Sequence, residues 1–116
     1  MRIDGPALLA RIYVGESDRH EGKPLYEVIV ALLRERGVAG ATVLRGIEGY
    51  GRAARVHTTR ILRLSEDLPI LIEVVDREDR LRAVLPEIDA MVEGGLITLE
   101  HVEVMTYRSP DTESSD

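Results

Sequence analysis

The chain contains no cysteine, no phenylalanine and no tryptophan. Without a thiol it can form no disulfide and has neither a thiolate metal ligand nor a thiol nucleophile, and the cytoplasm is the expected compartment. Its aromatic side chains are four tyrosines, which leaves few ring faces on which single-stranded nucleic-acid bases could stack. The hydrophobic core must therefore be built from leucine, isoleucine, valine and alanine.

Long apolar runs and an excess of positive charge are also missing. No stretch approaches the roughly 18 apolar residues of a membrane-spanning helix, and residues 1–5 do not resemble a secretion signal. The formal net charge is −6, so the surface as a whole repels a phosphate backbone. We therefore expect a protein that does not insert into a membrane and does not bind nucleic acid.

What the chain does contain fits one globular domain. Its 116 residues are 44% hydrophobic and 31% charged, which is usual for a chain that folds around a single modest core. We expect this domain to span residues 1–108. Residues 109–116 are short, polar and acidic, and we expect them to form a disordered tail.

The first half of the domain is predicted to run strand, helix, strand. Residues 7–14 alternate between two faces, which predicts a strand. Pro24 suits the first turn of a helix, and Gly37 is a typical C-cap at its end. The apolar stripe of this helix comprises Leu25, Val28, Ile29, Leu32 and Leu33. Residues 41–47 predict the second strand, followed by a glycine-rich loop to about residue 58.

The second half repeats this order. A short extended piece is expected at residues 60–64 and a strand at residues 68–75. Asp76 is the expected N-cap of a second helix, and Pro86 is expected to bend that helix or shift its start. The apolar stripe comprises Leu81, Val84, Leu85, Ile88, Met91 and Val92, then Gly94 and Gly95 end the helix before a last strand at residues 96–107.

This order of elements predicts an α+β domain in which two helices cover one face of a four-stranded sheet. The other face is expected to carry apolar and charged side chains together, namely Leu9, Tyr13, Leu71 and Val75 with Arg11 and Glu73. Such a mixture favours association through the sheet. The alternative is a weakly amphipathic face that is exposed to solvent.

A basic loop stands out in this acidic chain. Residues 45–63 contain five arginines, Arg45, Arg52, Arg55, Arg60 and Arg63, against one acid, Glu48. A guanidinium fits a phosphate or carboxylate with two parallel hydrogen bonds, and a small basic patch suits a small anion. Glycines at 46, 49 and 51 allow positive φ angles that turn backbone N–H groups toward an oxyanion. The alternative is a flexible hairpin whose arginines are solvated or paired with acids of a neighbouring subunit.

Other functional motifs are weak. The glycines match neither the dinucleotide-binding nor the P-loop pattern, and no nucleophile with a partner base can be named, so no catalysis is expected. His20, His57 and His101 have no paired spacing, so no metal site is expected. His57 is either a hydrogen-bond donor to a ligand or an ordinary turn residue. The polar residues Glu16, Asp18, His20 and Lys23 form either a solvated connection or a wall of the site.

Four segments carry a family resemblance: residues 15–20 (GESDRH), 22–26 (GKPLY), 40–51 (GATVLRGIEGYG) and 57–69 (HTTRILRLSEDLP). They resemble an uncharacterised family of bacterial and archaeal PII-like proteins, and the resemblance covers residues 8–107. It implies a ferredoxin-like βαββαβ subunit with a four-stranded antiparallel sheet and two helices on one face. It also implies a homotrimer with the sheets facing inward and a loop that resembles the T-loop of PII signalling proteins.

The resemblance further implies a ligand. The segment Gly49-Tyr50-Gly51-Arg52 is similar to the Gly-aromatic-Gly-Arg segment with which PII proteins bind adenine nucleotides between subunits. PII proteins carry a second, lysine-rich phosphate loop before the last strand, whereas residues 93–95 here are Glu-Gly-Gly, so AMP or ADP is expected rather than ATP. The expected ligand-binding residues are Arg45, Gly49, Tyr50, Gly51, Arg52, Arg55, His57 and Arg60.

Together, these features predict a trimeric, non-enzymatic regulatory protein that needs no cofactor and binds an adenine nucleotide as effector. It is expected to signal to a protein partner such as a membrane transporter or channel. The alternative function is a ligand-independent trimeric scaffold whose arginines contact a partner protein.

Overall fold

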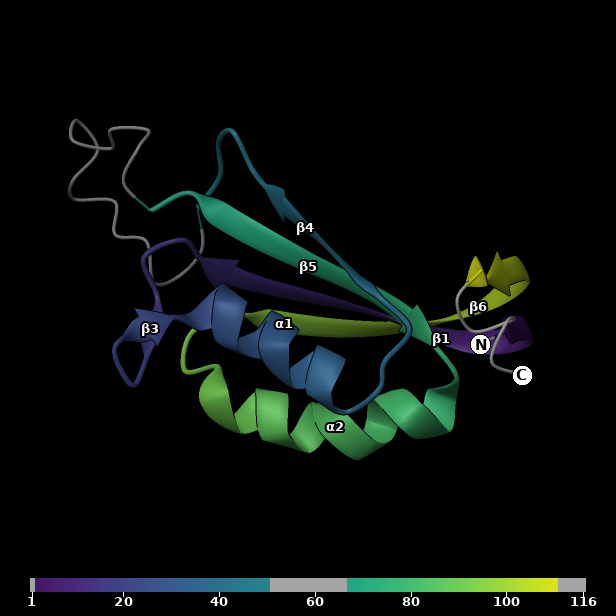
Figure 1. Cartoon of the computed structure of the whole chain (residues 1–116). Helices are drawn as coiled ribbons and strands as arrows, with labels where there is room; N and C mark the ends of the chain where they lie inside the picture. Colours follow the sequence, from purple (N-terminus) through teal and green to yellow (C-terminus); the bar gives the residue numbers. More distant parts are fainter. Residues whose placement is uncertain (1, 51–66, 111–116) are drawn as a thin grey trace.

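A computed structural model describes residues 2–50 and 67–110 of the chain (Figure 1). The main sheet has the strand order β4-β5-β1-β6, with antiparallel neighbours throughout, and both helices lie on one of its faces (Figure 1). The elements are β1 (Arg2–Gly15), β2 (Arg19–His20), β3 (Lys23–Pro24), α1 (Leu25–Glu35), β4 (Ala41–Arg45), β5 (Pro69–Asp76), α2 (Glu78–Met91) and β6 (Leu96–Arg108). The predicted α+β, ferredoxin-like arrangement is confirmed. The predicted extended piece at residues 60–64 lies outside the described residues.

Strand β1 lies at the centre of the sheet because it pairs with β5 on one side and with β6 on the other. Its even-numbered residues from Leu8 to Val14 are buried under the helices. The strand begins at Arg2 rather than at residue 7, and its register with β6 shifts between Ile3 and Gly5. Gly5 has a φ angle of +81°, so this bulge needs a glycine and interrupts the alternation from which the strand was predicted.

Helix α1 begins and ends as the local sequence predicts. Pro24 directly precedes its first turn, and the helix buries its apolar stripe against the sheet. At the other end the N–H of Val38 donates to the carbonyl of Leu33, and the N–H of Gly37 donates to that of Arg34, both at 3.1 Å. Gly37 has a φ angle of +78°. This pair of bonds is a Schellman motif, so the role of Gly37 as the helix stop is confirmed.

Helix α2 departs from the prediction at its start, and Pro86 lies inside it. Arg77 occupies the N-cap position and no side chain caps the helix, so the predicted N-cap, Asp76, is wrong. The helix also continues through Pro86 to Met91 without a break. The carbonyl of Arg82 loses its usual N–H donor at this proline. Because Arg82 and Pro86 are both exposed, water can bond that carbonyl and the helix tolerates the proline.

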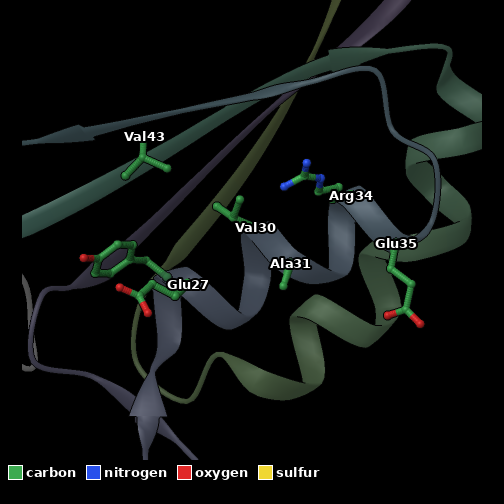
Figure 2. Close-up of a pocket in the computed structure, with 7 residues that line it drawn as sticks. Glu27, Val30, Ala31, Arg34, Glu35 and Val43 are labelled. Carbon is green, nitrogen blue, oxygen red and sulfur yellow. The ribbon is translucent and has the colours of Figure 1, made fainter.

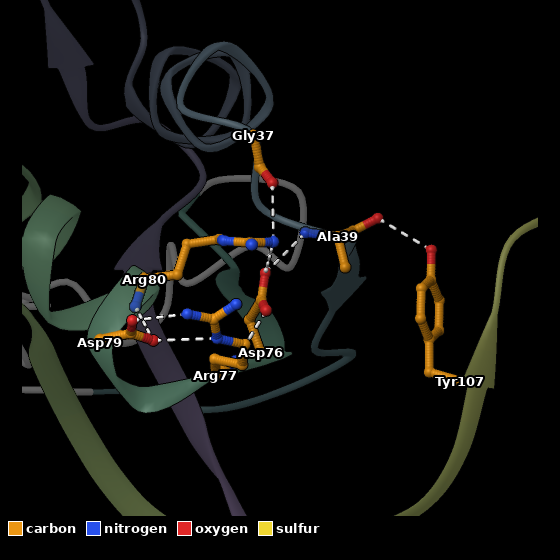
Figure 3. Close-up of polar contacts among 7 residues, drawn as sticks. All are labelled: Gly37, Ala39, Asp76, Arg77, Asp79, Arg80 and Tyr107. Atoms are coloured by element: carbon orange, nitrogen blue, oxygen red, sulfur yellow. Dashed lines mark hydrogen bonds and ion pairs between the residues drawn. The ribbon is translucent and has the colours of Figure 1, made fainter. Parts of the chain in front are cut away.

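The carboxylate of Asp76 is fully buried and joins two connections of the fold (Figure 3). Its Oδ2 accepts a hydrogen bond from the N–H of Ala39 at 2.9 Å, and its Oδ1 accepts one from the N–H of Arg77 at 2.6 Å. The guanidinium of Arg80 lies 3.5 Å from Oδ2. A buried carboxylate is costly unless it is bonded and paired, so these partners explain why β5 can end in an acid. The β5–α2 junction is thereby tied to the α1–β4 connection.

The face of the sheet opposite the helices, here called the uncovered face, carries both apolar and charged side chains. One row crosses all four strands and consists of Leu44, Leu71, Tyr13 and Leu96. In the next row the guanidinium of Arg11 lies 3.0 Å from Glu73, and it also lies 3.4 Å from Glu100, which pairs with Leu9 in the row beyond. The hydrogen bond to Glu73 raises the pKa of Arg11. The mixed character predicted for this face is therefore present.

Candidate functional site

The segments that flank the basic loop meet at one end of the sheet, at a place here called the loop base, which consists of residues 15–18, 45–50 and 67–69. Strands β1 and β4 end there and β5 begins there. The N–H of Glu16 donates to the carbonyl of Leu68, and the N–H of Gly46 donates to the carbonyl of Pro69, each at 2.8 Å. These two backbone bonds hold the three segments together.

Side chains fasten the connection after β1 to the start of β5. Asp67 Oδ1 accepts hydrogen bonds from the N–H of Ser17 at 3.1 Å and from its hydroxyl at 2.7 Å. Asp18 Oδ2 accepts one from the N–H of Gly15 at 2.9 Å. A Cβ on Gly15 would stand 2.5 Å from Asp67 Oδ1, so a side chain there would displace this carboxylate. Of the four polar residues weighed as a site wall, the structure brings Glu16 and Asp18 to the loop base.

Gly46 and Gly49 are needed for close packing rather than for backbone conformation. Neither has a positive φ angle, so the expected positive-φ turn of their N–H groups is wrong at these two positions. A Cβ on Gly46 would lie 2.8 Å from Cγ of Pro69, and one on Gly49 would lie 3.1 Å from the same atom. The proline ring occupies the space that a side chain would need.

Arg45 is the one arginine of the predicted ligand set that belongs to the described residues. Its Nη2 donates to Oε2 of Glu16 at 2.6 Å. The side chain of Arg45 is 58% exposed and that of Glu16 is 27% exposed. Within the described residues, this arginine is therefore paired with an acid of its own chain.

Two further predicted residues, Gly49 and Tyr50, also lie at the loop base. Tyr50 is 87% exposed, so its ring is free to cover a ligand. The predicted residues Gly51, Arg52, Arg55, His57 and Arg60 lie outside the described residues, and their roles stay predictions.

The described part of the loop base is acidic. Its acids are Glu16, Asp18, Glu48 and Asp67, against the single base Arg45. The segment from Arg45 to Arg63, which was predicted to be basic, does not include Asp67. This acid lies just before β5 and belongs to the loop base. The signal available in the sequence was the pair of acidic segments GESD and SED, which flank the two strands that meet here.

A separate groove of about 460 Å³ lies between α1 and β4, where Val43 faces Val30 across it (Figure 2). It is lined by Tyr26, Glu27, Val30, Ala31, Arg34, Glu35 and Val43. Ligand pockets of this size usually enclose most of their ligand, whereas this groove is broadly open to solvent. None of the predicted ligand-binding residues lines it.

Within residues 2–50 and 67–110, no three His, Asp or Glu side chains gather closely enough to hold a metal ion together. Neither described helix has the length and apolar character needed to cross a bilayer. The described residues thus supply no metal-binding cluster.

The sequence matches the family DUF190, "Uncharacterized ACR", over residues 7–104. It is 40% identical over 105 residues to a UPF0166 protein of Aquifex aeolicus, which covers 90% of this chain and 98% of that one. A UPF0166 protein of Methanocaldococcus jannaschii is 39% identical over 99 residues, which covers 84% of this chain and 91% of that one. The resemblance stated from the sequence motifs is confirmed at the level of the family.

Solved PII-like proteins share the fold. A PII-like protein from Thermus thermophilus superposes with a TM-score of 0.61 at 17% identity, covering 89% of this chain and 94% of that one. CPII from Thiomonas intermedia, solved with bound ADP, AMP and acetate, superposes with a TM-score of 0.54 at 18% identity, covering 92% and 93%. At such low identity these similarities establish a PII-like fold and no more.

Proposed function

Since this chain belongs to the DUF190 family, we propose that it is a cytoplasmic, PII-like regulatory protein that binds AMP or ADP and signals to a protein partner. The observation that carries the proposal is the PII-like fold, because CPII, which shares this fold, was solved with ADP and AMP bound. A membrane transporter or channel is the kind of partner proposed. The protein is proposed to act by binding rather than by catalysis.

The proposed nucleotide site is centred on the loop base and the loop that follows it. Arg45 and Tyr50 support it, because a guanidinium can bond a phosphate and an exposed ring can pack on adenine. Gly49 provides a close approach of the backbone to Pro69. The remaining proposed ligand residues, Gly51, Arg52, Arg55, His57 and Arg60, come from the sequence resemblance.

We propose that three copies associate through the uncovered face and that the nucleotide lies between neighbouring copies. Two residues of the apolar row on this face, Leu44 and Leu96, are 49% and 54% exposed in the single chain. Covering such apolar area stabilises an assembly by roughly 25 cal/mol per Å². The row therefore favours association of the subunits through this face.

Calorimetry with AMP, ADP, ATP and cyclic AMP tests the nucleotide proposal. We expect AMP and ADP to bind with dissociation constants below about 1 mM, on the order of those of metabolite sites, and Arg52→Ala to weaken them about tenfold or more, because a hydrogen bond to a charged group is lost. The control is Arg2→Ala, which removes the same charge at the far end of β1 and should leave binding unchanged.

One result would favour the alternative function, a ligand-independent scaffold. If none of the four nucleotides binds, and Arg52→Ala alters only the interaction with a protein partner, then the basic loop serves protein contacts and the chain senses no nucleotide.

A further inference from the structure

The ion pair between Glu16 and Arg45 connects two of the three segments of the loop base. Oε2 of Glu16 lies 2.6 Å from Nη2 of Arg45. Among the described residues this is the only side-chain hydrogen bond that Arg45 makes. A guanidinium has five N–H donors, so this arginine has donors beyond the one bonded to Glu16 with which it can bond a second anion.

An anion that approaches Arg45 meets the carboxylate of Glu16 on the same guanidinium. The two negative groups repel each other, and the nearby acids Asp18, Glu48 and Asp67 add to the unfavourable potential. The side chains of Glu16 and Arg45 differ in how freely they can move. Glu16 is held by its backbone bond to Leu68 and is 27% exposed, whereas the Arg45 side chain is 58% exposed. The arginine is therefore the partner that can turn toward a ligand.

Building on the function proposed above, we propose that Glu16 is an internal competitor of the ligand. It holds Arg45 in the empty protein and releases it to the phosphate of a bound nucleotide. Arg45 is the last residue of β4, and the N–H of the next residue, Gly46, is bonded to Pro69, so the backbone is held here while the arginine side chain turns. Glu16 thereby lowers the affinity for every anion that needs Arg45.

A double-mutant cycle with ADP tests the competition by calorimetry. Half-exposed ion pairs are weak, so we expect Glu16→Gln to lower the dissociation constant about two- to fivefold. Arg45→Gln should raise it about tenfold or more. In the Arg45→Gln background, Glu16→Gln should have little further effect, because the competing pair no longer exists. A dissociation constant that is unchanged or higher in Glu16→Gln overturns the inference.

Glu87→Gln is the matched control. Glu87 Oε1 also lies 2.6 Å from an arginine, Arg36, and its side chain is 47% exposed, but the pair joins α1 to α2. The substitution removes the same charge from a similar pair, so it should leave the dissociation constant for ADP unchanged. If Glu87→Gln lowers the dissociation constant as much as Glu16→Gln does, the effect comes from net charge and the proposed competition is overturned. Thermal unfolding of each variant checks that it is folded.

A second readout does not depend on adenine recognition. In nitrogen NMR spectra, the guanidinium signal of Arg45, assigned by its loss in Arg45→Gln, should shift on addition of pyrophosphate. The midpoint should fall at an about two- to fivefold lower concentration in Glu16→Gln than in the unsubstituted protein. Equal midpoints, or no shift in either protein, overturn the inference. If the midpoints differ but no nucleotide binds, the proposed function fails and the competition stands.

Discussion

Gly95 is a residue at which two distant segments of the chain come into direct contact. A Cβ at this position would collide with the carbonyl oxygen of Tyr13, which belongs to the central strand β1. A backbone carbonyl in a strand cannot move aside as the end of a flexible side chain can. At Gly40, by contrast, a Cβ would meet no atom within 4 Å.

We therefore expect Gly95→Ala to lower the free energy of unfolding by about 1–3 kcal/mol, because the backbone must shift to admit the methyl group. Gly40→Ala should leave this free energy unchanged or raise it by up to about 1 kcal/mol, since alanine restricts the unfolded chain. Urea unfolding of both variants measures the difference. Equal effects at the two positions would contradict the close contact at Gly95.

Asp76 is a second position where one residue affects much of the fold. Asp76→Ala should lower the free energy of unfolding by about 1–3 kcal/mol, because it removes the acceptor of the N–H of Ala39 and a buried ion-pair contact to Arg80. Asp76→Asn should lower the free energy of unfolding by less, since an amide oxygen can still accept the hydrogen bond from the N–H of Ala39. Urea unfolding provides the measurement, and a mild effect of the alanine variant would show that water replaces the carboxylate.

At the scale of elements, α2 contains a proline, a residue that destabilises the interior of a helix. Pro86 lies inside the helix and is exposed. Pro86→Ala should raise the free energy of unfolding by about 1–3 kcal/mol, because the new N–H can bond the carbonyl of Arg82 and alanine favours a helix. The midpoint of thermal unfolding should rise accordingly. A lower midpoint would mean that the helix is adapted to the proline.

The first turn of α2 should respond to pH. The hydrogen bond from Arg82 lowers the pKa of Glu78, and His101 of β6 contributes to the shift. A carboxylate whose pKa is lower in the folded protein stabilises the fold above its unfolded pKa of about 4.3, and this stabilisation is lost as the pH falls through the folded pKa. Glu78→Gln should thus be less stable than the unsubstituted protein at neutral pH, and the difference should shrink in acid, at about pH 3. A difference of equal size at both pH values would contradict the coupling.

At the scale of the whole molecule, the uncovered face is proposed to hold three chains together. Leu71→Lys places a charge in its apolar row and should reduce the mass measured by light scattering from that of a trimer to that of the 12.9 kDa chain. Met105→Lys is the control, because Met105 is 91% exposed and lies outside that row. A chain that is monomeric without any substitution would remove the trimer proposal.

The sequence by itself determined the two helices and the four strands of the main sheet, in their order, whereas the short pair β2 and β3 was not predicted. The apolar residues of α1 recur at helical spacing and those of β1 and β5 alternate, so each segment has one face that must be buried. Gly37 ends α1 because the local backbone needs a positive φ angle. Such signals act over a few residues, and they can be recognised without knowing what lies nearby. The start of β1 depends on its pairing with β6, and the buried bond from Ala39 to Asp76 also comes from outside these short windows. The course of α2 through Pro86 depends on the exposure of this part of the helix.

Only the tertiary structure decided which residues meet at the loop base. Arg45 and Glu16 are 29 residues apart, and Asp67 and Ser17 are 50 residues apart. Nothing in a local pattern links these positions. They meet because β4 pairs with β5 and β5 pairs with β1, in antiparallel registers that bring the ends of β4 and β1 to the start of β5. The sheet thereby places the acid Glu16 beside Arg45, which the sequence alone had predicted to bind an anionic ligand.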